Sequence, residues 1–194
     1  PQRQQDADTC LFACLVAIKK AIAKKLGSIY MVPENQTALQ ARAAGILRNG
    51  GTFASRDTQN FIRDILKLQT DVVVDTPVVK LGRIISALEA GNVPLISYSL
   101  GAIDHWIAIL EIRLNDTQVE VVAMNPLLQG LETMTAGDFA KRLAAGDYTT
   151  QGASFSQLMI VELPDEVRAV SDHFKVTATR KPQLRIIERR PGNE

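Results

Sequence analysis

The segment formed by residues 93–124, VPLISYSLGAIDHWIAILEIRLNDTQVEVVAM, decides the fold class. It contains three apolar runs of the length and composition that β-strands have, at residues 93–100, 106–114 and 118–124. The turn residues Asn115-Asp116-Thr117 separate the last two runs, which predicts an antiparallel hairpin. A fourth strand is predicted downstream at residues 155–163, where Pro164 ends it.

The chain before this segment is helical in pattern. Apolar residues at Leu11, Leu15, Ile18 and Ile22 form one stripe and predict a helix over residues 10–26, which Gly27 ends. Further helices are predicted at 34–48, from 55 to 68, from 76 to 90 and, after the strands, at 135–144, with a short strand at 72–74.

In the helix that Thr76 and Pro77 open, the stripe is predicted to be Val78, Leu81, Ile85 and Leu88. Helices that precede strands, rather than alternating with them, favour an α+β fold with an antiparallel sheet.

The composition and charge of the chain limit the classes of function that it can have. The 194 residues carry a net charge of +1, with 46% hydrophobic and 22% charged residues, which suits one soluble domain. A balanced charge disfavours a nucleic-acid partner, and no apolar run approaches the roughly 20 residues that a membrane helix needs. We predict a domain at residues 1–165 and a basic tail or docking extension at residues 166–194.

The N-terminus is polar and lacks a signal peptide, and the chain begins with Pro1 rather than Met. Both features suit a domain of a longer protein or a processed product. We therefore expect a cytoplasmic location, or delivery or secretion as part of a larger protein.

Two cysteines and two histidines are too few for a disulfide scaffold or a His-rich metal site, so no metal or other cofactor is predicted. Cys10 starts the first helix, where free N–H groups and the helix dipole favour the nucleophilic thiolate. The alternative for Cys10 is a small buried hydrophobe, and for Cys14, one turn further, it is simple packing.

His105 opens a predicted buried strand, whereas His173 lies in the polar tail, so His105 is the candidate base. Asn125 ends the paired strand and would accept the Nδ1–H of His105; its alternative is a turn signal before Pro126. Continued strictly, the hairpin register puts Asn125 on the face of Trp106. A β-bulge, or a strand end that twists away, would bring Asn125 to the face of His105.

Together these residues resemble the papain-like cysteine proteases, and most of all the double-glycine leader peptidases that process bacteriocin precursors. The resemblance rests on five features in order, over residues 4 to 145: Gln4-Gln5-Asp6-Ala7-Asp8-Thr9-Cys10, Gly50-Gly51-Thr52, Gly91-Asn92-Val93-Pro94, His105-Trp106 and Asn125-Pro126. Leu11 stands where the family usually has Gly, and Asn125 where it usually has Asp, although papain uses Asn.

The resemblance implies a papain-like fold, with helices packed on an antiparallel sheet and the nucleophile at the start of the first helix. It implies Cys10 as nucleophile, His105 as general base and acid, Asn125 as the orienting residue and Gln4 as oxyanion donor. A narrow channel selecting Gly before the cut bond would also follow, and Trp106 and Leu11 are candidate walls of it.

The predicted function is a cysteine endopeptidase acting on a protein or peptide. It would be a stand-alone protease, a domain of a bacterial toxin or effector, or a double-glycine-type processing peptidase. A toxin domain would also have an inhibitor or immunity protein as a partner. Two alternatives stay open: a Cys-His deamidase, transglutaminase or amidase on the same fold, and a non-enzymatic binding module.

Overall fold

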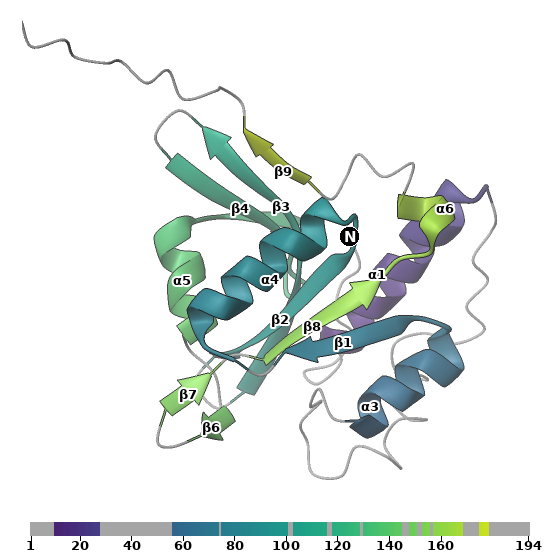
Figure 1. The fold of residues 1–194 in the computed structure, drawn as a ribbon, viewed down its shortest axis with the longest axis horizontal. Coiled ribbons are helices and arrows are strands. Elements are labelled where there is room, and N and C mark those ends of the chain that lie inside the picture. Colours follow the sequence, from purple (N-terminus) through teal and green to yellow (C-terminus); the bar gives the residue numbers. More distant parts are fainter. Residues whose placement is uncertain are drawn as a thin grey trace, which may run out of the picture.

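A computed structural model describes residues 10–27, 56–73, 75–100, 103–115, 118–128, 130–144, 148–150, 153–155, 157–168 and 175–178. Its centre is a sheet whose main path runs β1-β8-β2-β3-β4-β5, with every neighbouring pair antiparallel (Figure 1). The strands of this path are β1 (Gln69–Val73), β2 (Val93–Leu100), β3 (Ile103–Asn115), β4 (Gln118–Met124), β5 (Leu131–Thr135) and β8 (Gln157–Glu162).

Two further pairings complete the strands. β9 (Lys175–Ala178) runs parallel to β3 and pairs with Glu111–Leu114, beyond the part of β3 that pairs with β2. One strand of the sheet therefore lies within the predicted C-terminal extension. β6 (Tyr148–Thr150) and β7 (Ala153–Phe155) form a separate two-stranded sheet.

The closing signal of α1 and the opening signal of α4 act as predicted. α1 spans Cys10–Lys25, and Gly27 adopts a left-handed φ of 64° just past its end. α4 spans Pro77–Glu89, with the Thr76 hydroxyl accepting the Val79 N–H at 3.4 Å as an N-terminal cap. The other helices are α3 (Arg56–Phe61), which continues as the π-helix η1 (Ile62–Leu66), α5 (Ala136–Ala144) and α6 (Asp165–Arg168).

Helices cover both faces of the sheet. Side chains of α1, α3 and η1 share one core cluster with Trp106, Ala108 and Met124. Side chains of α4 and α5 share the other cluster with Ile107 and Ile109. Successive residues of β3 point to opposite faces, so the sheet is buried on both sides along this strand.

The α+β class and the antiparallel hairpin at the Asn115 turn are confirmed, and so is a first helix beginning at Cys10 and packed on the sheet. The predicted helix at 34–48 lies outside the described residues. β5, β6, β7 and β9 were not predicted, because they are short and have little apolar alternation.

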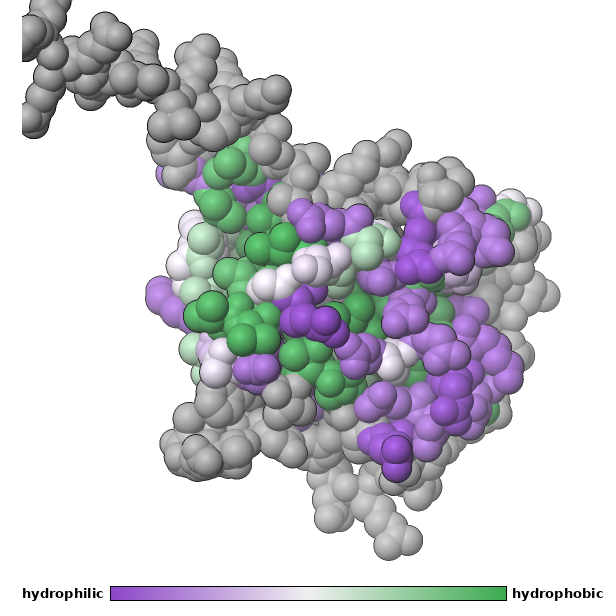
Figure 2. Space-filling view, viewed as in Figure 1, coloured by the Kyte–Doolittle hydropathy of each residue, from purple (hydrophilic) through white to green (hydrophobic). Residues whose placement is uncertain are grey.

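The predicted stripe of α4 is right at Ile85 and Leu88, which pack against the core, and wrong at its first two positions. Val78 is 80% exposed and Leu81 is exposed too, while the buried positions are Lys80, Ile84, Ala87 and Leu88. Apolar residues occupy more than one side of this helix, and contact with the sheet selects the side that carries Ile84. The side of α4 that faces away from the sheet carries hydrophobic residues that are exposed on the surface (Figure 2).

Among the described residues, no helix is both long and apolar enough to cross a membrane.

Candidate active site

A β-bulge decides which face of the sheet Asn125 occupies. Near the turn, Arg113 pairs with Glu120, as the charge pattern predicts, but the register shifts by one residue between Ile109 and Glu111. Beyond the shift, Ile109 pairs with Ala123. Continued to the end of β4, the shifted register puts Asn125 on the face of Ile107 and His105. The bulge thus brings Asn125 to the face of His105, where an uninterrupted register would not place it.

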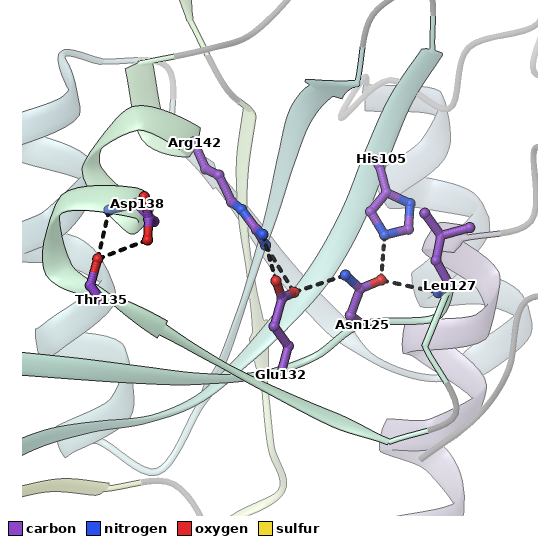
Figure 3. Close-up of polar contacts among 7 residues, drawn as sticks. All are labelled: His105, Asn125, Leu127, Glu132, Thr135, Asp138 and Arg142. Carbon is purple, nitrogen blue, oxygen red and sulfur yellow. Dashed lines mark hydrogen bonds and ion pairs between the residues drawn. The ribbon is translucent and has the colours of Figure 1, made fainter.

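His105 and Asn125 are in direct contact. His105 Nε2 lies 2.7 Å from Asn125 Oδ1, and both side chains are buried (Figure 3). The predicted pairing of the two residues is confirmed, but the predicted nitrogen is wrong: Nε2, not Nδ1, faces the amide. The Asn125 side chain, at the end of β4, reaches the Nε2 side of the imidazole ring. Nδ1 points away from Asn125 (Figure 3).

The Asn125 amide is held by two further groups. Its Oδ1 also accepts the Leu127 N–H at 3.0 Å, and its Nδ2 donates to Glu132 Oε2 at 2.8 Å. Glu132 in turn accepts two hydrogen bonds from Arg142, at 2.5 and 2.9 Å. Figure 3 shows the resulting chain from α5 through β5 to the end of β4 and His105.

Local structure places Arg142 at the end of this chain. The Thr135 hydroxyl accepts the Asp138 N–H at 3.1 Å and donates to the Asp138 carboxylate at 2.9 Å, which caps the start of α5. Arg142 lies one turn further along the helix. Its guanidinium contacts Glu132 on β5 and lies 4.7 Å from the centre of the Tyr98 ring.

Tyr98 closes the network from the other side. It pairs with His105 across β2 and β3, and the two rings meet edge to face with centres 5.6 Å apart. Burial raises the pKa of Tyr98, the positive charge of Arg142 lowers it, negative charges on Glu132 and Cys10 raise it, and a hydrogen bond with the Asn125 side chain lowers it.

Burial lowers the pKa of His105 below its ordinary value of 6.5, because the charged ring would lose its hydration. The hydrogen bond to Asn125 opposes this shift, since an imidazolium donates more strongly to the amide oxygen. Arg142 lowers and Glu132 raises the pKa through their charges. Neutral His105 is thus the favoured form near pH 7.

The two thiols lie on the other face of β3. Cys14 is completely buried, and its Sγ donates to the Trp106 carbonyl at 3.7 Å. Burial raises the pKa of Cys14 well above 9.0, and the neighbouring Cys10 raises it further. Cys10, at the first position of α1 and 3% exposed, shares its core cluster with Trp106 and Met124. Trp106 directly follows His105 in the sequence, and Met124 directly precedes Asn125.

The remaining predicted site residues have different outcomes. Gln4 and His173 lie outside the described residues. Trp106 and Leu11 are 1% and 0% exposed and pack in the core between α1 and the sheet. Their role as walls of a substrate channel stays a prediction.

Sequence reasoning missed Tyr98, Glu132 and Arg142. Only Tyr98 had a usable signal, because a short connection between two antiparallel strands places it opposite His105. Glu132 and Arg142 belong to a strand that was not predicted and to a helix whose packing was unknown.

Comparison with known proteins gives a likeness in structure but none in sequence family. No protein-family model matches the sequence, and no curated protein matches it. A crystal structure of UfSP from C. elegans is similar over 84% of this chain, with 12% sequence identity and a TM-score of 0.47. The chain spans about a third of that protein's length, at 32%.

Proposed function

We propose that the chain is a cysteine endopeptidase in which Cys10 is the nucleophile and His105 the general base and acid. The observation that carries the proposal is the buried 2.7 Å contact between His105 Nε2 and Asn125 Oδ1. An acceptor at Nε2 holds the proton there and leaves Nδ1 with a lone pair. That arrangement is what a histidine needs if it is to take a proton from a thiol.

The proposed reaction has two halves. Nδ1 of His105 takes the Cys10 proton, and the thiolate attacks the carbonyl carbon of a peptide bond. The oxyanion is stabilised by backbone N–H groups at the start of α1 and by the Gln4 amide. When the C–N bond breaks, His105 returns the proton to the leaving amine. Water, activated by His105, then hydrolyses the thioester.

Two features support Cys10 over Cys14 as the nucleophile. Cys10 lies at the N-terminus of a 16-residue helix with no acidic residue in its first turn, which favours a thiolate. Cys14 lies one turn inside the helix, with its thiol against the Trp106 carbonyl and its pKa raised by burial. The thiolate is therefore disfavoured at Cys14.

A comparison of new protein N-termini tests the proposal. The wild-type chain, Cys10→Ala and Cys14→Ala would each be incubated with a proteome, and new N-termini identified by mass spectrometry. We expect cleavage products with the wild type and Cys14→Ala and none with Cys10→Ala. The same products with Cys10→Ala would contradict the proposal. A mass change in target proteins without new N-termini would indicate a deamidase or transglutaminase instead.

Histidine variants provide a second test. His105→Ala is expected to remove nearly all turnover, because it removes the imidazole that would accept the thiol proton. His173→Ala is the matched control and is expected to leave turnover nearly unchanged. Full activity in His105→Ala would exclude this mechanism.

A further inference from the structure

The side-chain amide of Asn125 could face His105 through either its oxygen or its nitrogen, because the two ends have nearly the same shape. The two orientations have opposite consequences. An oxygen facing Nε2 requires a proton on Nε2, whereas an NH₂ group facing Nε2 requires a lone pair there and moves the ring proton to Nδ1. Only the first leaves Nδ1 able to accept a proton.

The surroundings of Asn125 select the first orientation. The Leu127 N–H can only donate, and it lies 3.0 Å from Oδ1. An ionised Glu132 can only accept, and its Oε2 lies 2.8 Å from Nδ2. Turning the amide over would place an oxygen against a carboxylate and an NH₂ group against an N–H. Both contacts would be repulsive in a partly buried site.

Arg142 keeps Glu132 charged and in place. The two form a bidentate pair with side chains only 23% and 18% exposed. Hydrogen bonds from Arg142 hold the pKa of Glu132 below its ordinary value. Arg142 is itself fixed by its contact with the Tyr98 ring, and Tyr98 packs against His105.

We propose that Glu132 and Arg142 are positioning residues that lock the Asn125 amide in one orientation and thereby keep the proton of neutral His105 on Nε2. Its catalytic consequence rests on the proposed function, since an unprotonated Nδ1 matters only if a thiol proton is transferred there. The effect on the histidine tautomer does not depend on any activity.

The tautomer is measured by NMR of protein labelled with ¹⁵N-histidine, because the two ring nitrogens give different shifts when protonated and unprotonated. The chain has two histidines, and His173→Gln assigns the signals. In the wild type above its pKa, His105 is expected to be protonated at Nε2. Glu132→Leu, which removes the acceptor, is expected to move a large share of the proton to Nδ1.

Glu132→Gln and Arg142→Met keep the test decisive if Glu132→Leu unfolds. Gln at 132 can still accept from Asn125 Nδ2, so the Nε2–H form is expected to persist. Arg142→Met leaves Glu132 without its partner, so a partial loss of that form is expected. Lys141→Gln is the matched control, since Lys141 makes an exposed ion pair on the same helix.

Turnover separates this proposal from the proposed function. In an active enzyme, Glu132→Leu should lower kcat about tenfold or more with little change in KM, and Glu132→Gln should restore most of it. A tautomer shift without any wild-type activity would leave the positioning role intact and exclude the peptidase. A wild type protonated at Nδ1, or a tautomer unchanged in both Glu132→Leu and Arg142→Met, would overturn the positioning role.

Discussion

The Asn125 amide contacts His105, Leu127 and Glu132 at once, and these contacts give a common turn residue a specific chemical role. An isolated Asn before Pro indicates a turn and nothing more. Here Oδ1 accepts hydrogen bonds from His105 and Leu127, and Nδ2 donates one to the Glu132 carboxylate. The orientation of the side chain is therefore determined, and with it the nitrogen of His105 that carries the proton.

At Cys10, the difference from Cys14 is testable by alkylation. We expect iodoacetamide to modify Cys10 well below pH 8 and Cys14 much more slowly. Both cysteines are buried, but Cys10, 3% exposed, lies at a helix N-terminus that favours the thiolate, whereas burial raises the pKa of Cys14. Mass spectrometry of peptides after timed exposure from pH 5 to 9 gives both rates. Equal rates that appear only above pH 8 would argue against a nucleophilic Cys10.

For His105, the direction of the pKa shift predicts an NMR titration. In Cys10→Ala, which keeps position 10 uncharged, the pKa of His105 is expected to fall below 6.5 because burial disfavours the imidazolium. Its activity as a base would accordingly persist into mildly acidic solution. A midpoint above 6.5 would mean that hydration, or the negative charge of Glu132, outweighs burial.

At the scale of elements, the bulge of β3 between Ile109 and Glu111 connects the hairpin to the site. Deleting Leu110 would remove the extra residue without changing the pairs on either side of it, because Glu111 pairs with Val122 and Ile109 with Ala123. Asn125 is therefore expected to stay on the face of His105, and ¹⁵N-histidine NMR should still show the proton on Nε2.

The matched control for the deletion is Leu110→Ala. This variant keeps the bulge and removes the same side chain, and it should also retain the wild-type tautomer. Loss of that tautomer in the deletion but not in Leu110→Ala would show that the bulge itself, rather than the pairing on either side of it, holds Asn125 beside His105.

The two sides of α4 differ in what they contribute to stability. Ile84 is fully buried, so Ile84→Ala is expected to lower the free energy of unfolding by about 2–5 kcal/mol. Val78 is 80% exposed, and Val78→Ala should change it by no more than about 0.5 kcal/mol. Urea unfolding measures both. Similar losses in the two variants would restore Val78 to the buried stripe.

At the scale of the whole molecule, the candidate site residues lie on both faces of the sheet. α1 packs on one face with Cys10 and Cys14, and α5 carries Arg142 on the other. β2, β4 and β5 contribute Tyr98, Asn125 and Glu132. The candidate site is thus assembled from segments that are distant in sequence.

This assembly predicts an acid-sensitive fold. His105 and Glu132 both have a lower pKa when folded, so the unfolded chain binds their protons more readily. Their contribution to stability is complete above the ordinary pKa values and decreases on acidification, first below 6.5 and then below 4.5. The midpoint of thermal unfolding should fall accordingly from pH 7 to 4.

Glu132→Gln isolates the second part of this acid response. Without an ionisable group at position 132, the decrease below pH 4.5 is expected to become smaller, although the variant is less stable at pH 7. An unchanged pH profile would mean that other carboxyl groups dominate acid unfolding.

Local signals in the sequence were enough to predict several elements. The stripe of α1 with its closing Gly27, the Thr76-Pro77 start of α4 and the Asn115 turn all act over a few residues, and each predicted its element. The pairing of His105 with Asn125 was also within reach, because both lie at the ends of strands joined by one hairpin.

The other features depend on contacts between distant parts of the chain. A bulge adds one residue without a sequence signal, so the face of Asn125 could not be read from alternation. The buried side of α4 depended on the sheet it packs against. Glu132 and Arg142 acquired their roles through contacts with Asn125 and Tyr98. Such contacts join positions that no local pattern relates, and their geometry exists only after the sheet has formed.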